Sequence, residues 1–314
     1  MLLLTLCTVR TAAAQDTYLL LITGVSGEET LATQYQKWGA SVVDGAKKRG
    51  VATANITYLA EATEKDPARI RARATRENVS QAFDDIAKRA KEGDEVFILL
   101  FGHGTFDGKV GSFNLPGPDL TAVDFARLFE RLLPQRIAFV NTSASSGAFL
   151  EPLKGPRRVI VTATKTGGER LDTIFPGFFV EALDADTADR DKNGRISVLE
   201  AFEYAKAKVA AQYEQGGHIL TEHAVLEDGS EGKLAGAVYL SPQRTRDAAT
   251  VAAAAANPAL RALLDQQDVL ERQIAELRLK KDTMDAAQYE AQFEKLATDL
   301  ALKTREIRDL QTKK

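Results

Sequence analysis

The residues that could most readily take part in catalysis lie in two short turns, and each turn follows an apolar run. His103 stands between two glycines after the run 96–101, and the segment 141–147 places three serines around Ala144 after the run 137–140. An imidazole can act as a general base, and a hydroxyl next to such a base can act as a nucleophile. The two turns therefore indicate either a hydrolytic site or the remnant of one.

The arrangement of these turns resembles the catalytic core of the caspase and legumain cysteine peptidases. In that family one strand ends in His-Gly, and a later strand ends in a small-residue turn with a Cys two residues before Ser-Gly. The matching residues here are His103, Gly104 and, at the position of the nucleophile, Ala144. The resemblance covers roughly residues 16 to 240 and is strongest at the two turns. It implies that backbone N–H groups of both turns once held an oxyanion.

The alanine at position 144 narrows the possible functions. A methyl group cannot attack a carbonyl carbon, so cysteine-peptidase chemistry is excluded. One alternative is an active hydrolase that uses Ser143 or Ser145 with His103, although neither serine has the direction of position 144 and a hydroxyl needs a strong, oriented base. Another is a purely structural histidine. We expect a pseudopeptidase that acts as a calcium-stabilised module and binds a protein or peptide in the strand-end cleft.

A second chemical motif occupies residues 189–200, with the sequence DRDKNGRISVLE. Its residues follow the spacing of an EF-hand loop, in which Gly194 permits the sharp turn at position 6. The pattern predicts a Ca²⁺ site, and the alternative is a solvated acidic loop. A single such loop is typical of a structural brace rather than of a paired sensor. The predicted ligands are Asp189, Asp191, Asn193, the carbonyl of Arg195, Ser197 and Glu200.

The order of the predicted elements indicates an α/β fold. Short apolar runs at 18–23, 55–59, 96–101, 136–140 and 158–163 alternate with helical patterns at 31–48, 75–86 and 121–133. Such alternation predicts a mostly parallel sheet that is covered by helices on both faces. The resemblance implies a caspase-like three-layer αβα sandwich over residues 15–242. In such sheets ligands bind at the carboxyl ends of the strands, where both turns lie.

The composition changes after the predicted α/β domain. Residues 243–256 are expected to form a linker that is rich in alanine, and residues 257–314 carry two stripes of apolar residues at 3-4 spacing. A short break at 282–285 favours an antiparallel helical hairpin of the coiled-coil type. A single hairpin buries only the apolar residues that face each other between its two helices. We therefore expect a further contact with the α/β domain, a second copy or a partner.

The first residues and the overall charge bear on location. Residues 1–14 combine an apolar run with an A-x-A motif, which predicts a secretory signal peptide, the alternative being a buried strand. Cys7, the only cysteine, lies in that segment, so a processed chain would have no disulfide. A net charge of −3 gives no reason to expect nucleic acid as a partner, and the apolar run is too short to span a membrane. We expect a secreted or periplasmic protein.

Overall fold

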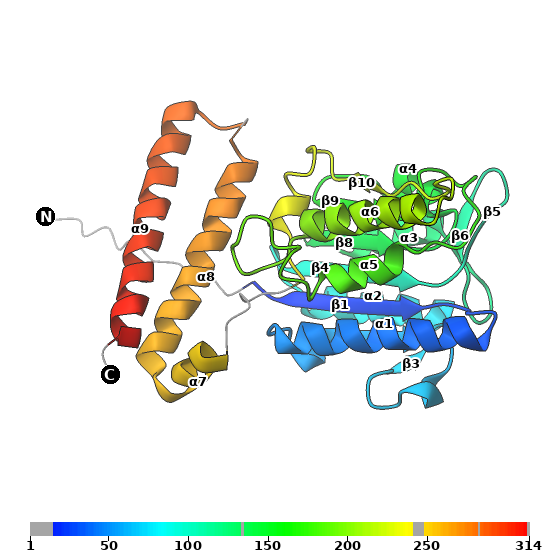
Figure 1. Cartoon of the computed structure of the whole chain (residues 1–314), viewed down its shortest axis with the longest axis horizontal. Helices are drawn as coiled ribbons and strands as arrows, with labels where there is room; N and C mark the ends of the chain where they lie inside the picture. Colours follow the sequence, from blue (N-terminus) through cyan, green and yellow to red (C-terminus); the bar gives the residue numbers. More distant parts are fainter. Residues whose placement is uncertain (1–14, 133–134, 241–247, 282, 313–314) are drawn as a thin grey trace, which may run out of the picture.

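The computed structural model describes residues 15–132, 135–240, 248–281 and 283–312 (Figure 1). The predicted signal segment 1–14, with Cys7, lies outside these residues. The described chain has a mostly parallel seven-stranded sheet with helices on both faces, followed by a helical region at the C-terminal end. The predicted three-layer α/β architecture is therefore confirmed.

The main sheet has the strand order β10-β9-β8-β4-β1-β2-β3. The two central strands, β1 (Thr17–Thr23) and β4 (Glu95–Phe101), are buried along their whole length, because helices cover both faces. The other parallel strands are β2 (Ile56–Ala60), β3 (Ala72–Arg73), β8 (Arg136–Asn141) and β9 (Arg158–Thr162). The short strand β10 (Val225–Glu227) pairs antiparallel with β9.

A second, three-stranded antiparallel sheet follows directly after His103. It consists of β5 (Gly104–Phe106), β6 (Gly111–Phe113) and β7 (Leu120–Thr121). These strands of two or three residues were not expected from the sequence, because such short segments carry too little alternation to be read as strands. The small sheet fixes the direction in which the chain leaves the His103 turn.

The helices divide between the two faces of the main sheet. One core contains side chains of α1 (Glu29–Lys48), α5 (Phe175–Ala182) and α6 (Val198–Gln215), and it takes Leu19 and Leu21 from β1. The other contains side chains of α2 (Arg76–Arg89), α3 (Ala122–Phe129) and α4 (Leu150–Leu153), and it takes Leu20 and Ile22. The alternation along β1 is the two-residue period of a strand.

The C-terminal region begins with α7 (Ala248–Ala256), which is a helix in a segment predicted as a linker. The helices α8 (Pro258–Leu279) and α9 (Ala286–Thr312) then lie side by side, as expected of a hairpin. Their seam buries Leu260, Leu264 and Ile307. Gln267, a polar residue of the predicted seam, is also buried and donates to the Thr304 hydroxyl at 3.3 Å.

The hairpin contacts the α/β domain at the end of the sheet where the parallel strands begin. Arg136, the first residue of β8, lies 3.3 Å from the Glu276 carboxylate of α8, and Leu279 packs against one core cluster. In Figure 1 the hairpin stands at one end of the molecule, and β5 and β6 stand at the other. The hairpin is thus remote from the turns at the carboxyl ends of the strands.

We expect a chain truncated after residue 240 to keep a folded α/β domain. Of the residues in the two large core clusters and packed against them, only Leu279 comes from the hairpin. A domain with its own core can fold alone. Thermal unfolding followed by circular dichroism should give one cooperative transition that is only modestly shifted. Aggregation or loss of the transition would show that the hairpin belongs to the main fold.

A second prediction concerns Glu95, the buried first residue of β4. Burial raises the pKa of this carboxyl to about 7, although Arg136 and Arg195 lie nearby and oppose the shift. The folded state therefore binds more protons than the unfolded state between about pH 4.5 and pH 7. This contribution to the free energy of unfolding is present below that window and is lost as the pH rises through it.

Urea unfolding of the natural protein and of Glu95→Gln at pH 5 and pH 8 measures the effect. The stability of the natural protein relative to the variant should be lower at pH 8, by at most about 3 kcal/mol. An equal or higher relative stability at pH 8 would contradict the assignment.

Candidate functional site

The two turns singled out in the sequence meet at the carboxyl ends of neighbouring strands. β4 pairs in parallel with β8, with Leu100 opposite Asn141, so the residues that follow each strand lie side by side. A Cβ atom at Gly104 would overlap the carbonyl oxygen of Ala144 and crowd the Ser143 hydroxyl. Only a glycine permits this close approach. The structure thus brings together the predicted residues of both turns.

His103 is held by two loops other than the serine turn. Its Nε2 lies 3.0 Å from the carbonyl oxygen of Ser26, and its Nδ1 lies 3.1 Å from Oδ1 of Asp172. Both neighbours of the ring are hydrogen-bond acceptors. The edge of the ring also faces Tyr35, at a centroid distance of 6.4 Å. The imidazole is therefore oriented by groups that do not include a nucleophile.

The serines around Ala144 bond to other partners. Ser143 donates to Oδ1 of Asn141 at 2.7 Å, and the Ser146 hydroxyl lies 3.1 Å from that of Thr164. Ser145 is 1% exposed, and its hydroxyl has no hydrogen-bond partner among the described residues. Its φ of 57° lies in the left-handed region, which is uncommon for a residue with a side chain. No hydrogen bond joins His103 to either candidate nucleophile, Ser143 or Ser145.

A cavity of about 660 Å³ opens beside His103 at the carboxyl ends of β1 and β2. Ser26, whose carbonyl contacts the imidazole, lies in its wall, and the Glu61 carboxylate accepts from the Ser26 amide at 3.0 Å and from its hydroxyl at 2.7 Å. Burial raises the pKa of Tyr35, also in this wall, to about 12, so its phenol stays a hydrogen-bond donor at neutral pH.

Acidic side chains predominate around this cavity. Four glutamates line it against two cations, and one of those cations, Lys65, pairs with Glu29 at 2.6 Å. The remaining charged groups are Glu28, Glu61, Glu64 and Arg73. A net acidic lining favours a cationic group in the cavity. The sequence offered no signal for this site, because its walls come from loops separated by more than 30 residues.

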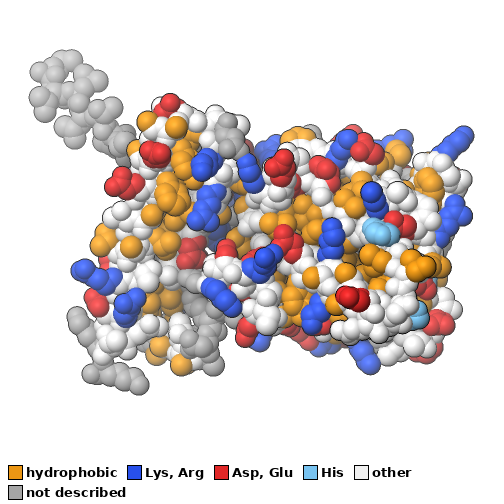
Figure 2. All heavy atoms as spheres, turned by 45° about the horizontal axis from the view of Figure 1, so that its top comes forward, with side chains coloured by type: hydrophobic (Ala, Val, Ile, Leu, Met, Phe, Trp, Pro, Cys, Tyr) orange, Lys and Arg blue, Asp and Glu red, His pale blue; other side chains and the backbone are white. Residues whose placement is uncertain are grey.

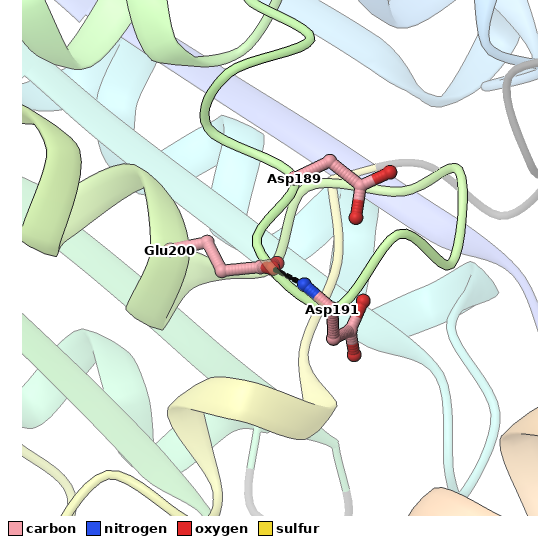
Figure 3. Close-up of side chains that lie close together, drawn as sticks. All are labelled: Asp189, Asp191 and Glu200. Carbon is pink, nitrogen blue, oxygen red and sulfur yellow. Dashed lines mark hydrogen bonds between the residues drawn. The ribbon is translucent and has the colours of Figure 1, made fainter.

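The second candidate site is the predicted metal loop, shown in Figure 3. Ligand atoms of Asp189, Asp191 and Glu200 all lie within 4.8 Å of one another. Asp189 accepts from the amides of Asn193 at 3.1 Å and Gly194 at 2.8 Å, which folds the loop around the carboxylates. Gly194 has a φ of 80°, as a sharp turn requires. This oxygen-rich set fits a hard divalent cation such as Ca²⁺.

The other predicted ligands organise the loop. Asn193 accepts from the Arg195 amide at 2.8 Å, and Ser197 forms a capping box with Glu200 at the start of α6. The Glu200 carboxylate thus serves both the helix cap and the acidic cluster. Burial raises the pKa of Asp191, and the nearby charges of Glu200 and Asp189 add to the rise. A cation bound between these carboxylates would favour the ionised form of Asp191.

Comparison with known proteins does not assign a family. No family model and no curated protein matches the sequence. A solved structure that matches is protein GSU0716 from Geobacter sulfurreducens, with 13% identity and a TM-score of 0.42 over 68% of this chain and 92% of that chain. A likeness this distant carries no functional argument. Within the described residues, no helix has the length and apolar character needed to cross a membrane.

We expect Ca²⁺ to raise the melting temperature of the natural protein, because a ligand that binds only the native state stabilises it by RT ln(1 + [L]/Kd). Asp191→Asn removes one charged ligand and should reduce this rise by at least half. Asp186→Asn, the same change at an exposed position before the loop, should leave the rise intact.

The rise in melting temperature with Ca²⁺ should also become smaller as the pH falls. Protons compete with the ion for the Asp191 carboxyl, whose pKa is raised. Melting curves recorded with EDTA and with millimolar Ca²⁺ at two pH values measure both effects. Identical curves with and without the ion would contradict the metal assignment.

Proposed function

We propose that this protein is a secreted or periplasmic homologue of caspase- and legumain-type peptidases that binds a protein or peptide without cleaving it. The observation that carries the proposal is the junction of the two turns. Gly104 packs directly against the carbonyl oxygen of Ala144 and the side chain of Ser143 at the carboxyl ends of β4 and β8, and position 144 has no nucleophilic atom. Residues 12–14, with their predicted cleavage motif, support export.

The orientation of the polar groups supports the loss of cleavage. A general base must reach the proton of its nucleophile within hydrogen-bond distance. The two ring nitrogens of His103 instead face Ser26 and Asp172. The Ser143 hydroxyl already donates to Asn141, so it has no proton left to offer a base. These contacts favour a binding site over a serine hydrolase.

The acidic cavity supports the choice of ligand. Ser26 lines the cavity and also contacts His103, so the two are neighbours. An extended peptide that crosses the turns can therefore place a side chain in the cavity. The excess of glutamates favours lysine or arginine for that side chain. The volume of about 660 Å³ lies within the range of pockets that bury small ligands.

The proposed calcium ion has a structural role in this scheme. Asp189, Asp191, Asn193 and Glu200 would hold it, and it would neutralise their crowded charge. The loop is tied to residues 238–239 by an isolated bridge between Ser197 and Tyr239 and by the Val198 amide, which donates to the Val238 carbonyl at 2.9 Å. The ion would thus brace the last described residues of the α/β domain.

The experiment that tests the proposal restores a thiol. Ala144→Cys should be labelled by an electrophilic peptide faster than an exposed cysteine, because a neighbouring imidazole promotes the thiolate. A peptide with lysine next to the electrophile should label faster than one with glutamate. Adding Glu28→Gln and Glu64→Gln should reduce this preference, whereas Glu214→Gln on the exposed surface of α6 should not. Labelling is followed by mass spectrometry.

Two outcomes separate the alternatives. Adding His103→Ala to Ala144→Cys should remove the enhanced labelling, and the natural protein should not cleave peptides. Labelling that does not depend on His103 would overturn the peptidase-type arrangement. Cleavage by the natural protein that disappears with Ser143→Ala or Ser145→Ala would establish the serine hydrolase instead.

A further inference from the structure

A second large cavity, of about 800 Å³, lies between the hairpin and the metal loop. It is at the opposite end of the sheet from His103. One wall comes from the α/β domain through Asp191, Asn193, Arg195 and Tyr239. The other wall is one continuous face of α8 and α9. This cavity is independent of the cleft assigned above, and its place in the fold leaves it open to solvent along the hairpin.

The hairpin wall has an apolar floor. Three of its members are alanines, which leave space where larger side chains would close the groove against the α/β domain. The floor consists of Ile274, Ala275, Phe293, Ala297, Leu300 and Ala301. From Phe293 to Arg308 the cavity follows about four turns of α9, which at 1.5 Å per residue is about 22 Å. A recess of this length with an apolar floor suits a linear chain rather than a compact ligand.

Basic side chains stand at both ends of this groove. Arg305 and Arg308, one turn apart on α9, lie at one end, and Arg278 lies at the other, where it stacks over the Phe293 ring at 5.9 Å. No described residue forms an ion pair with Arg305 or Arg308. Figure 2 shows basic side chains next to hydrophobic ones on the hairpin. Paired guanidinium groups recognise carboxylates through charge-assisted hydrogen bonds.

The two carboxylates in the lining of the groove do not neutralise the positive charge of Arg305 and Arg308. Asp191 belongs to the metal cluster, and Glu271 lies on α8 and has its own interactions. Arg195, the fourth arginine of the lining, stacks on Tyr239 at 4.1 Å and is buried. Arg305 and Arg308 remain as an exposed cationic pair at the end of an apolar groove.

We propose that this groove binds a long-chain carboxylate. The carboxylate would lie between Arg305 and Arg308, and the alkyl chain would extend over the alanines toward Phe293. The charge of the pair selects an anion, and the apolar length selects a chain rather than a small acid. The groove thereby gives the hairpin a ligand of its own, distinct from any peptide in the cleft near His103.

Binding of radiolabelled tetradecanoate to the full chain, measured by equilibrium dialysis with EDTA present, tests the proposal. Binding should saturate at one site per chain. Removing two methylene groups should weaken it on the order of tenfold. An alkylammonium ion of the same length should not compete. The double variant Arg305→Gln/Arg308→Gln should bind at least tenfold more weakly, whereas Arg261→Gln, an exposed arginine of α8 outside the cavity, should bind normally.

A second pair of variants tests the floor of the groove. Ala297→Leu/Ala301→Leu keeps helix-forming residues but fills the recess, and it should block binding. Ala291→Leu, on an exposed part of α9 outside the cavity, is the matched control. Circular dichroism of each variant shows that the hairpin is intact. Absent or non-saturable binding, equal competition by the alkylammonium ion, or binding that survives both double variants would overturn the proposal.

Discussion

The reversal of strand order between β1 and β4 is the constraint on which the rest of the structure depends. After β1 the chain passes through α1 to β2 on one side, and after β4 it continues to β8 on the other. The loops that follow β1 and β4 therefore part from each other, and a crevice opens between them. Ser26 lies in the first loop and His103 in the second. Their contact of 3.0 Å bridges the crevice, and the acidic cavity opens directly beside it.

The opposite end of the sheet is organised by buried charge rather than by a crevice. Glu95, Arg136 and Arg195 lie within one electrostatic neighbourhood, although Arg195 belongs to the metal loop and Arg136 also pairs with α8. Burial lowers the pKa of Arg195, with Glu95 acting against that shift. The metal loop, the start of the sheet and the hairpin are thus joined through a few side chains. A change in charge at one of them must alter the energy of the others.

The sequence predicted the architecture well where the physical signal is local. Runs such as 96–101 are apolar on both faces, which only a covered parallel strand tolerates, and the strands and helices around them follow as expected. The acidic cluster of residues 189–200 also forms as its spacing predicted, because its members lie within twelve residues of one another, whereas the binding of Ca²⁺ there stays a prediction. The small sheet β5-β6-β7 was missed, and α7 stands in the expected linker, because an alanine run gives no apolar periodicity.

The partners of His103 could not be predicted for a different reason. Asp172 and Ser26 reach the imidazole from the loops after β9 and β1, and neither loop has a motif that marks it. Their proximity is a product of strand order. The same holds for the acidic cavity and for the groove beside the hairpin, whose walls come from distant parts of the chain. Sequence reasoning located the turn, and the tertiary fold determined what the turn faces.

The serine turn shows why a peptidase-like pattern is weak evidence of peptidase chemistry. Its small residues are required by packing: a Cβ at Gly147 would overlap the backbone at Lys165–Thr166, and Gly104 allows no side chain against Ala144. The Gly147 amide donates to the Thr164 hydroxyl at 2.8 Å, which fixes the turn against the loop after β9. All of these contacts are independent of a nucleophile. The turn can therefore keep its shape whether position 144 carries a thiol or a methyl group, so its shape alone does not indicate whether the site is catalytic.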